Sequence, residues 1–163
     1  MKNIPLLLTC FTLGACASME SDDPHSLFFD IPEGSTLSLN KKLNIDHRDT
    51  HALIQYGKVI NDNDKSDYDI NCRLEFKDFG PRTVEPEVFK ITRTEDGRNI
   101  ISVGNIVRYW TEVYLSSDKG TDIIKMVCQE YDGIEGKNFP VADMQDALGD
   151  YVTINFASEK PAK

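Results

Sequence analysis

Alternating apolar and polar residues, the pattern of a half-buried β-strand, recur along most of the chain. The longest example spans residues 106–115, where Val113 and Leu115 share one face with Tyr109 and where Trp110 shares the opposite face with charged side chains. Since the first face is the more apolar, we expect Tyr109 to pack in the core. The same pattern predicts further strands at residues 36–39, 52–60, 72–76, 88–94, 99–103, 123–131 and 151–156.

Turn-forming residues separate these segments. Pro32-Glu33-Gly34, Gly80-Pro81-Arg82 and Asp118-Lys119-Gly120 each predict a break between strands. Glu95-Asp96-Gly97-Arg98 contains the Asp-Gly pair that is typical of a hairpin turn, so we expect the chain to reverse there.

One segment has a helical period. Apolar residues recur three or four positions apart over residues 141–148, with Pro140 before them and Gly149 just after. Many short strands with this single helix predict a mainly β fold: one antiparallel β-barrel or sandwich with a short helix near the C-terminus.

The amino-terminal segment has a different pattern. Lys2 precedes an apolar stretch over residues 4–13, which is too short to cross about 30 Å of hydrocarbon as a helix. Small residues and a cysteine follow, as Leu13-Gly14-Ala15-Cys16. The segment resembles the signal peptide and lipobox of bacterial lipoprotein precursors, and the resemblance implies that the cysteine becomes the acylated amino terminus. The alternative is a soluble secreted protein, because Ala15-Cys16-Ala17 also fits the small-x-small pattern for cleavage after its last residue.

The lipoprotein interpretation divides the chain into a signal peptide (1–15), a flexible polar tether (16–26), a β-rich globular domain (27–158) and a polar tail (159–163). The 148 residues that remain after cleavage suit one domain with a single core. Ala17 stands in place of the aspartate that retains many enterobacterial lipoproteins in the inner membrane. By resemblance to that sorting rule, we expect an outer-membrane protein, lipid-anchored through Cys16, whose domain faces the periplasm.

The chain is acidic, with a formal net charge of −9 that becomes −10 when Lys2 leaves with the signal peptide. Such a surface repels nucleic acid and anionic lipid head groups. We therefore expect no nucleic-acid partner, attachment to the membrane through the lipid, and an envelope protein as the partner.

Two of the four cysteines, Cys72 and Cys128, remain available for pairing, since Cys10 leaves with the signal peptide and Cys16 carries lipid. In an oxidising compartment we expect a disulfide, which would close a loop of about 57 residues and contribute roughly 4 kcal/mol. Each cysteine lies on the apolar face of a predicted strand, so the bridge is expected to join two strands in the core. Two free buried thiols, or a metal or redox pair, are the alternatives.

His47 and His51 lie four positions apart, with Asp46 and Asp49 beside them. On a helix the two imidazoles would share a face and could hold zinc. Because this segment is predicted to be a loop that enters a strand, where positions four apart need not converge, we interpret it as a solvated turn.

The acidic loop over residues 61–69 has carboxylate spacing similar to the start of an EF-hand calcium loop. The pattern departs where coordination needs it, since Asp67 occupies the glycine position and Arg73 the closing glutamate position. We therefore expect no strong calcium site at Asp62 and Asp64, and interpret the loop as a solvated surface that a cation-rich partner could contact.

No arrangement typical of catalysis is present. The chain lacks a Gly-x-Ser-x-Gly elbow and a glycine-rich phosphate loop, and its three histidines accompany no recognisable nucleophile. Tyr109, Trp110 and Tyr114 are the aromatic residues that a ligand pocket would use, with core packing of Tyr109 as the alternative. We predict no catalytic residue, no metal ligand and no cofactor.

Short stretches over residues 34–149 resemble, in their order, a family of uncharacterised proteobacterial lipoproteins. The matching pieces are Gly34-Ser35, Leu53-Ile54-Gln55-Tyr56-Gly57, Cys72 with Leu74-Glu75, Val84-Glu85-Pro86 through Phe89, residues 111–116, Cys128 and Ala147-Leu148-Gly149. The resemblance implies an envelope lipoprotein and supplies no catalytic residue. We expect a non-enzymatic binding or scaffolding role in the envelope. The alternatives are an acidic inhibitor of a basic envelope enzyme, and a carrier of a small ligand or metal.

Overall fold

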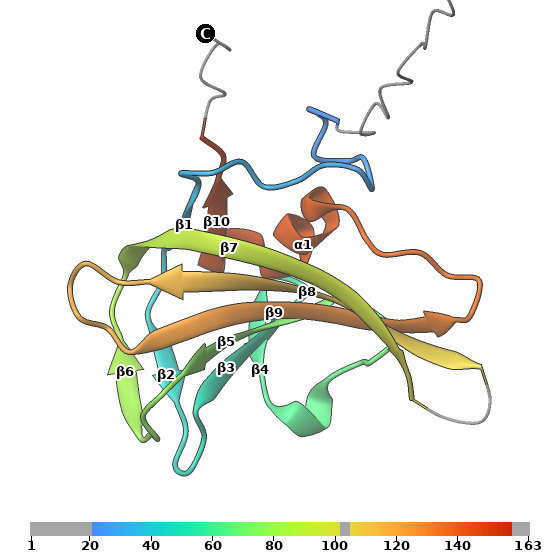
Figure 1. Ribbon diagram of the computed structural model, residues 1–163. Coiled ribbons are helices and arrows are strands. Elements are labelled where there is room, and N and C mark those ends of the chain that lie inside the picture. Colours follow the sequence, from blue (N-terminus) through green and yellow to red (C-terminus); the bar gives the residue numbers. More distant parts are fainter. Residues whose placement is uncertain (1–20, 102–104, 158–163) are drawn as a thin grey trace, which may run out of the picture.

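Figure 1 shows a computed structural model that describes residues 21–101 and 105–157 of the 163-residue chain. The predicted signal peptide, the predicted acylation site at Cys16 and the predicted polar tail over residues 159–163 lie outside the described residues. Residues 21–31 and the end of the last strand lie at one end of the molecule, and a short 3₁₀ helix lies at the opposite end (Figure 1).

The fold is mainly β, and its centre is one curled sheet of eight antiparallel strands in the order β10-β1-β7-β8-β9-β5-β3-β4. In chain order these strands are β1 (Thr36–Leu39), β3 (His51–Gln55), β4 (Lys58–Ile60), β5 (Asn71–Phe76), β7 (Glu87–Ile100), β8 (Ile106–Ser116), β9 (Ile123–Gly133) and β10 (Val152–Asn155). A separate two-stranded sheet consists of β2 (Leu43–Ile45) and β6 (Arg82–Val84). The helical elements are α1 (Val141–Leu148) and the 3₁₀ turns η1 (Asp62–Asp64) and η2 (Gly149–Tyr151).

The core fills the inside of this half-barrel. Alternate residues of the strands point inward, as the period of two requires, and Phe89, Val113 and Met126 are fully buried. The helix α1 contacts β3, β5 and β10, and its Met144 and Leu148 are also fully buried. The helix therefore closes the open side of the curled sheet, and the expected β fold with one short helix near the C-terminus is confirmed.

The segment predicted as one strand over residues 52–60 is a hairpin. Tyr56 and Gly57 both have positive φ, 52° and 67°, so they form the two-residue turn between β3 and β4. The amide of Gly57 donates to the carbonyl of Ala147 at 2.9 Å, which attaches this hairpin to the end of α1. The prediction of a continuous strand was wrong because the Tyr-Gly pair carries a weaker turn signal than Asn-Gly or Asp-Gly.

The turn predicted at Asp96-Gly97 was also wrong. β7 continues through this pair to Ile100 without reversing, so residues 99 and 100 belong to β7 and not to a returning strand; residues 102 and 103 of the predicted strand lie outside the described residues. Gly97 lies directly opposite Trp110 on β8, and a Cβ at Gly97 would collide with the indole ring. The glycine therefore makes room for the indole instead of forming a turn.

β7, β8 and β9 extend beyond their neighbours. β1 pairs only with residues 87–90 of β7, and β5 pairs with β9 no further than Gln129. The remaining three-stranded projection consists of residues 97–100, 106–110 and 130–133 and is called the tongue below; it extends to the right in Figure 1.

The predicted disulfide is confirmed. Cys72 and Cys128 lie directly opposite each other on β5 and β9, with Cα atoms 4.0 Å apart, and both side chains are fully buried. The bridge joins two adjacent strands of one sheet at the base of the tongue. On the chain-entropy model a loop of this length contributes about 4 kcal/mol to stability.

Candidate functional site

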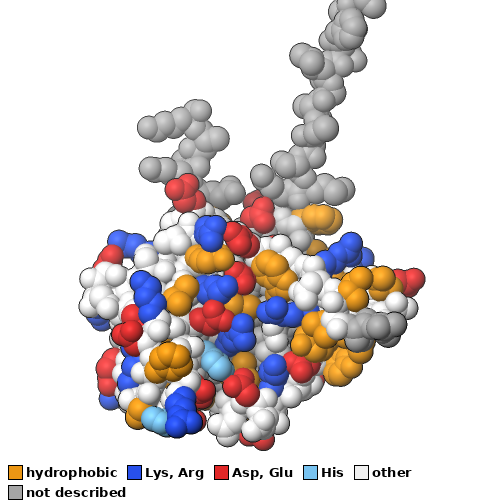
Figure 2. All heavy atoms as spheres, turned by 60° about the horizontal axis from the view of Figure 1, so that its bottom comes forward, with side chains coloured by type: hydrophobic (Ala, Val, Ile, Leu, Met, Phe, Trp, Pro, Cys, Tyr) orange, Lys and Arg blue, Asp and Glu red, His pale blue; other side chains and the backbone are white. Residues whose placement is uncertain are grey.

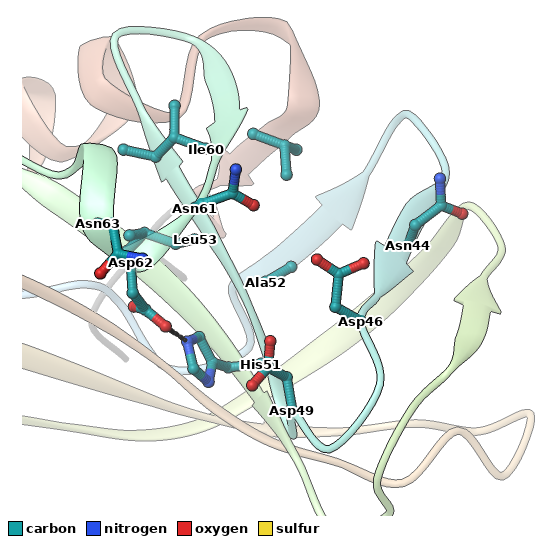
Figure 3. Close-up of a pocket in the computed structure, with 11 residues that line it drawn as sticks. Asn44, Asp46, Asp49, His51, Ala52, Leu53, Ile60, Asn61, Asp62 and Asn63 are labelled. Atoms are coloured by element: carbon teal, nitrogen blue, oxygen red, sulfur yellow. Dashed lines mark hydrogen bonds and ion pairs between the residues drawn. The ribbon is translucent and has the colours of Figure 1, made fainter.

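A polar pocket of about 280 Å³ lies beside η1, at the end of the molecule opposite residues 21–31 (Figures 1 and 3). It is formed by β2 and the turn after it, by the β3–β4 hairpin and by the start of the acidic loop. The lining residues are Asn44, Asp46, Asp49, His51, Ala52, Leu53, Val59, Ile60, Asn61, Asp62 and Asn63. Amides, carboxylates and one imidazole provide most of the polar groups, and this combination is typical of a site for a polar or charged ligand.

The turn at residues 46–49 presents two of the carboxylates. The amide of Asp49 donates to the carbonyl of Asp46 at 3.1 Å, and Arg48 has a positive φ of 71° at the third position of the turn. The amide of Gly80 donates to the carbonyl of Asp49 at 2.8 Å. A Cβ at Gly80 would collide with backbone carbonyl oxygens of this turn, so the connection between β5 and β6 packs directly against it and fixes its position.

His51 and Asp62 form the other part of the pocket. The Nε2 atom of His51 lies 3.0 and 3.3 Å from the two carboxylate oxygens of Asp62, as the dashed line in Figure 3 marks. These residues belong to two stretches that the sequence analysis considered separately. The β3–β4 hairpin brings them together, because it reverses the chain between them.

The pocket carries excess negative charge. Three carboxylates line it, and His51 is the one lining side chain that can become a cation. In the part of the chain that the structure describes, the side chains of Asp46 and Asp49 form no ion pair or hydrogen bond. A positively charged group entering the pocket would therefore find two carboxylates that have no cation of their own.

The arrangement does not form a metal cage. Over residues 21–101 and 105–157, no three His, Cys, Asp or Glu side chains converge closely enough to hold a metal ion. His47, the other histidine of the sequence pattern, is not among the pocket residues; its backbone forms an isolated β-bridge with Gly80.

The remaining groups of the acidic loop are engaged with separate partners. Asp67 pairs with Lys65 at 2.8 Å, and Arg73 pairs with Glu75 at 2.7 Å. Asp69 accepts a hydrogen bond from the Ser66 hydroxyl at 2.6 Å, and this bond, together with one from Tyr56, lowers the pKa of Asp69. The carboxylates of the loop therefore do not converge on one point as an EF-hand requires.

A buried amide holds the loop in place. Gln55 is almost fully buried, and its Nε2 group donates to the carbonyls of Ser66 and Asp69 at 2.8 and 3.0 Å. Its Oε1 atom accepts from the amide of Ser66 at 3.0 Å. The loop that carries Asp62 is thus attached to the same strand as His51, which was not apparent from the polar composition of residues 61–69.

The three aromatic residues considered as a ligand pocket do not come together. Tyr109 is buried inside the half-barrel, where its hydroxyl donates to the carbonyls of Gly133 and Gly136, so the expectation of core packing is confirmed. Trp110 and Tyr114 lie on the outer face, and the guanidinium of Arg93 stands 3.8 Å from the centre of the Tyr114 ring.

Glu87, Asp122 and Glu130, which lie outside the pocket, also have shifted pKa values. Burial acts to raise the pKa of Glu87, but hydrogen bonds from Ser117 and Thr121 outweigh it, and the pKa lies below its ordinary value. Burial also acts to raise the pKa of Asp122, but the guanidinium of Arg82 lowers it, and the pKa again lies below its ordinary value.

Glu130 differs from these two. Burial raises its pKa, and the nearby charges of Asp132, Asp143 and Asp69 raise it further. None of Glu87, Asp122 and Glu130 lines the acidic pocket. The first two hold loops in place, whereas Glu130 lies in an unfavourable environment for its charge.

Within the described residues, no helix is long and apolar enough to cross a membrane. Comparisons of the chain with protein-family models, with curated proteins and with solved structures found no match.

Proposed function

We propose that this protein is a lipid-anchored protein of the bacterial outer membrane, with a β domain that acts as a non-enzymatic binding module in the periplasm. The acidic pocket is the binding site, and its ligand is a lysine or arginine side chain of an envelope protein. The observation that carries this proposal is the pair of carboxylates, Asp46 and Asp49, that line a formed pocket without a cation of their own.

The chemistry of the pocket suits a cation in two ways. Carboxylates accept charge-assisted hydrogen bonds, and two of them on one turn can receive both nitrogens of a guanidinium. The Asn44, Asn61 and Asn63 side chains add amide groups around the same hollow, which can complete the hydrogen bonding of a polar ligand. The net charge of −9 also favours encounter with a basic partner.

The position of the pocket supports the same role. The anchor proposed at Cys16 precedes Ser21, and residues 21–31 lie at the end of the domain away from η1 (Figure 1). A domain that is attached at that end exposes the pocket to the periplasm and to proteins there.

The test is capture of partners from crosslinked envelopes with three forms of the full chain. The first is the wild type, the second is Asp46→Asn/Asp49→Asn, and the third is Asp118→Asn/Asp150→Asn, which removes the same charge from exposed positions elsewhere. We expect the wild type and the third form to capture the same basic protein, and the second to lose at least about 90% of it, because about 1.4 kcal/mol of lost binding energy is tenfold in affinity. Equal capture by all three forms would contradict the role of the pocket.

The anchor needs its own test. Mass spectrometry of the mature protein is expected to show an amino terminus at Cys16 that bears acyl chains. A free amino terminus that begins after Ala17 would instead show a soluble secreted protein, without bearing on the pocket.

The acidic surface also favours a second function, inhibition of a basic envelope hydrolase. The identity of the captured partner distinguishes inhibition from scaffolding. If it is a hydrolase whose activity falls in proportion to the amount of this protein bound, and if Asp46→Asn/Asp49→Asn restores that activity, then the pocket serves inhibition. A partner without hydrolytic activity favours scaffolding.

A further inference from the structure

Large apolar side chains are exposed together at the end of the tongue. Ile100, the last residue of β7, is 68% exposed, and Ile101 after it and Ile134 after the end of β9 are also exposed. Leu27 and Phe28, which lie on the amino-terminal segment, are exposed as well, Phe28 to 56%. Figure 2 shows hydrophobic side chains gathered on the right-hand side of the molecule, where the tongue lies.

These apolar residues belong to segments that lie close together in the fold. Leu27 and Phe28 border a cleft of about 510 Å³ together with Gly97 and Arg98 of β7 and with the loop that follows β9. Ile100 lies two residues beyond Arg98, on the same face of the strand, and Ile134 lies in that loop. We call these five side chains the apolar edge: Leu27, Phe28, Ile100, Ile101 and Ile134.

The apolar edge shares no residue with the acidic pocket. Asp96, Arg98 and Lys137 line the cleft beside it, Asp132 lies at the end of β9 and Glu135 on the following loop, so two positive and three negative side chains lie nearby. Exposed contiguous apolar surface of this kind marks a site of contact with a protein, a ligand or a membrane.

The amino-terminal segment links this edge to the proposed anchor. The amide of Ala142 in α1 donates to the carbonyl of Pro24 at 3.1 Å, which attaches the segment to the domain. Only four residues lie between Cys16 and Ser21, so the five steps from one Cα atom to the other span at most about 18 Å. An acylated Cys16 would therefore hold the apolar edge close to the bilayer.

We propose that the apolar edge rests in the interfacial layer of the bilayer to which the protein is anchored. The proposal deepens the proposed anchoring and rests on it. Ile100 and Ile134 are exposed and do not line the cleft, which suits contact with a flat fluid surface better than binding of an enclosed acyl ligand. Because the nearby side chains and the chain as a whole are acidic, the contact depends on burial of apolar surface and gains nothing from anionic head groups.

The experiment is cosedimentation of the mature chain, with Cys16→Ser to remove the lipid, with vesicles of phosphatidylethanolamine and phosphatidylcholine and with vesicles that also contain phosphatidylglycerol. The variant Ile100→Asp/Ile134→Asp places two charges in the apolar edge. Its matched control is Phe79→Asp/Val88→Asp, which places the same charges at exposed apolar residues away from the tongue; Phe79 is 68% exposed, as Ile100 is.

We expect the parent and the control to bind neutral vesicles with similar partition coefficients, and the edge variant to bind at least about tenfold more weakly, since each isoleucine loses the burial of a large apolar side chain. Weaker binding of the parent to the anionic than to the neutral vesicles is also expected, because the chain carries a net charge of −9. Equal binding by the edge variant and its control would overturn the proposal.

Two further results would overturn it. Binding of a single-chain amphiphile below its micelle concentration, without binding to vesicles, would identify the cleft as a carrier site. A dimer of the parent that the edge variant converts to a monomer, again without vesicle binding, would show that a second copy covers the edge. Because the tested chain carries no lipid, these outcomes are independent of whether Cys16 is acylated in the cell.

Discussion

The acidic pocket and the tongue are supported by the fold in different ways. Two carboxylates of the pocket, Asp46 and Asp49, stand on a turn that backbone hydrogen bonds hold against Gly80, and the third, Asp62, is paired with His51. The tongue projects beyond β1 and β5 and carries exposed isoleucines at its end. A fixed arrangement of charges suits a ligand of defined shape, whereas an apolar projection suits a surface without defined shape, and the two regions can be disturbed separately.

The largest loss of stability is expected from removal of the disulfide, which supports both the acidic pocket and the tongue. Cys72 and Cys128 join β5, which pairs with the strand of His51, to β9, which enters the tongue. The change Cys72→Ala/Cys128→Ala should cost about 4 kcal/mol, a large share of the 5–15 kcal/mol that stabilises a typical domain. Thermal unfolding followed by circular dichroism is the measurement. A double variant as stable as the parent would show that the bridge is not a main support of the sheet.

The next largest loss of stability is expected from a change that disturbs the pocket and leaves the tongue unchanged. Gly80→Ala places a methyl group against the carbonyls of Ile45 and Asp46, so the turn must move. We expect a loss of about 1–3 kcal/mol in stability and a loss of partner capture, with vesicle binding unchanged. Gly120→Ala provides the control for capture, because a Cβ there meets open space; its φ of 85°, unlike that of Gly80, lies in the left-handed region, so a loss of stability in this control is expected from backbone strain. Undiminished capture by Gly80→Ala would show that the position of the turn is unimportant.

The corresponding substitution in the tongue should leave the pocket unchanged. In Gly97→Ala the new methyl group collides with the indole of Trp110, so the ring must shift outward. We expect the fluorescence maximum of Trp110, the one tryptophan of the chain, to move to longer wavelength, with a destabilisation of about 1 kcal/mol and with partner capture unchanged. An unshifted spectrum would contradict the assigned packing of Trp110 on Gly97.

The smallest change in stability is expected from removal of the charge of Glu130. The raised pKa of Glu130 means that its carboxylate is less favourable in the folded than in the unfolded protein. The sign follows by linkage: Glu130 destabilises the fold at pH values above its folded pKa, and this cost disappears below its unfolded pKa of about 4.3. Glu130→Gln should therefore raise the melting temperature by a few degrees at pH 7 and leave it unchanged near pH 4. Glu135→Gln, an exposed carboxyl on the following loop, is the control, and an equal rise in both would indicate a general effect of net charge.

Much of the fold could be predicted from local pattern. Alternation located most strands, the period of three to four located α1, and the facing of Cys72 and Cys128 toward the core anticipated their bond. The errors came from glycines. Gly97 was taken as a turn although it accommodates an indole from the neighbouring strand, and that strand partner is known only once the sheet has formed.

The pocket could be predicted in its parts but not as a whole. His51 and Asp62 were each considered, in two separate patterns. An unbroken strand over residues 52–60 would have placed them about 30 Å apart, since each residue advances by about 3.3 Å. The turn at Tyr56-Gly57 removes that separation. The contribution of Asn44 depends on the small β2–β6 sheet, whose strands are too short to show a period.

The most direct test of the pocket as a binding site uses a photo-crosslinking residue at Asn63, on its lining, in intact cells. We expect a discrete adduct with a basic envelope protein, which is lost when Asp46→Asn/Asp49→Asn is added and is not formed from the same residue placed at Asp118. Adducts of equal yield from both positions, or an adduct from Asn63 that persists without the two carboxylates, would contradict the claim that this pocket binds a positively charged partner.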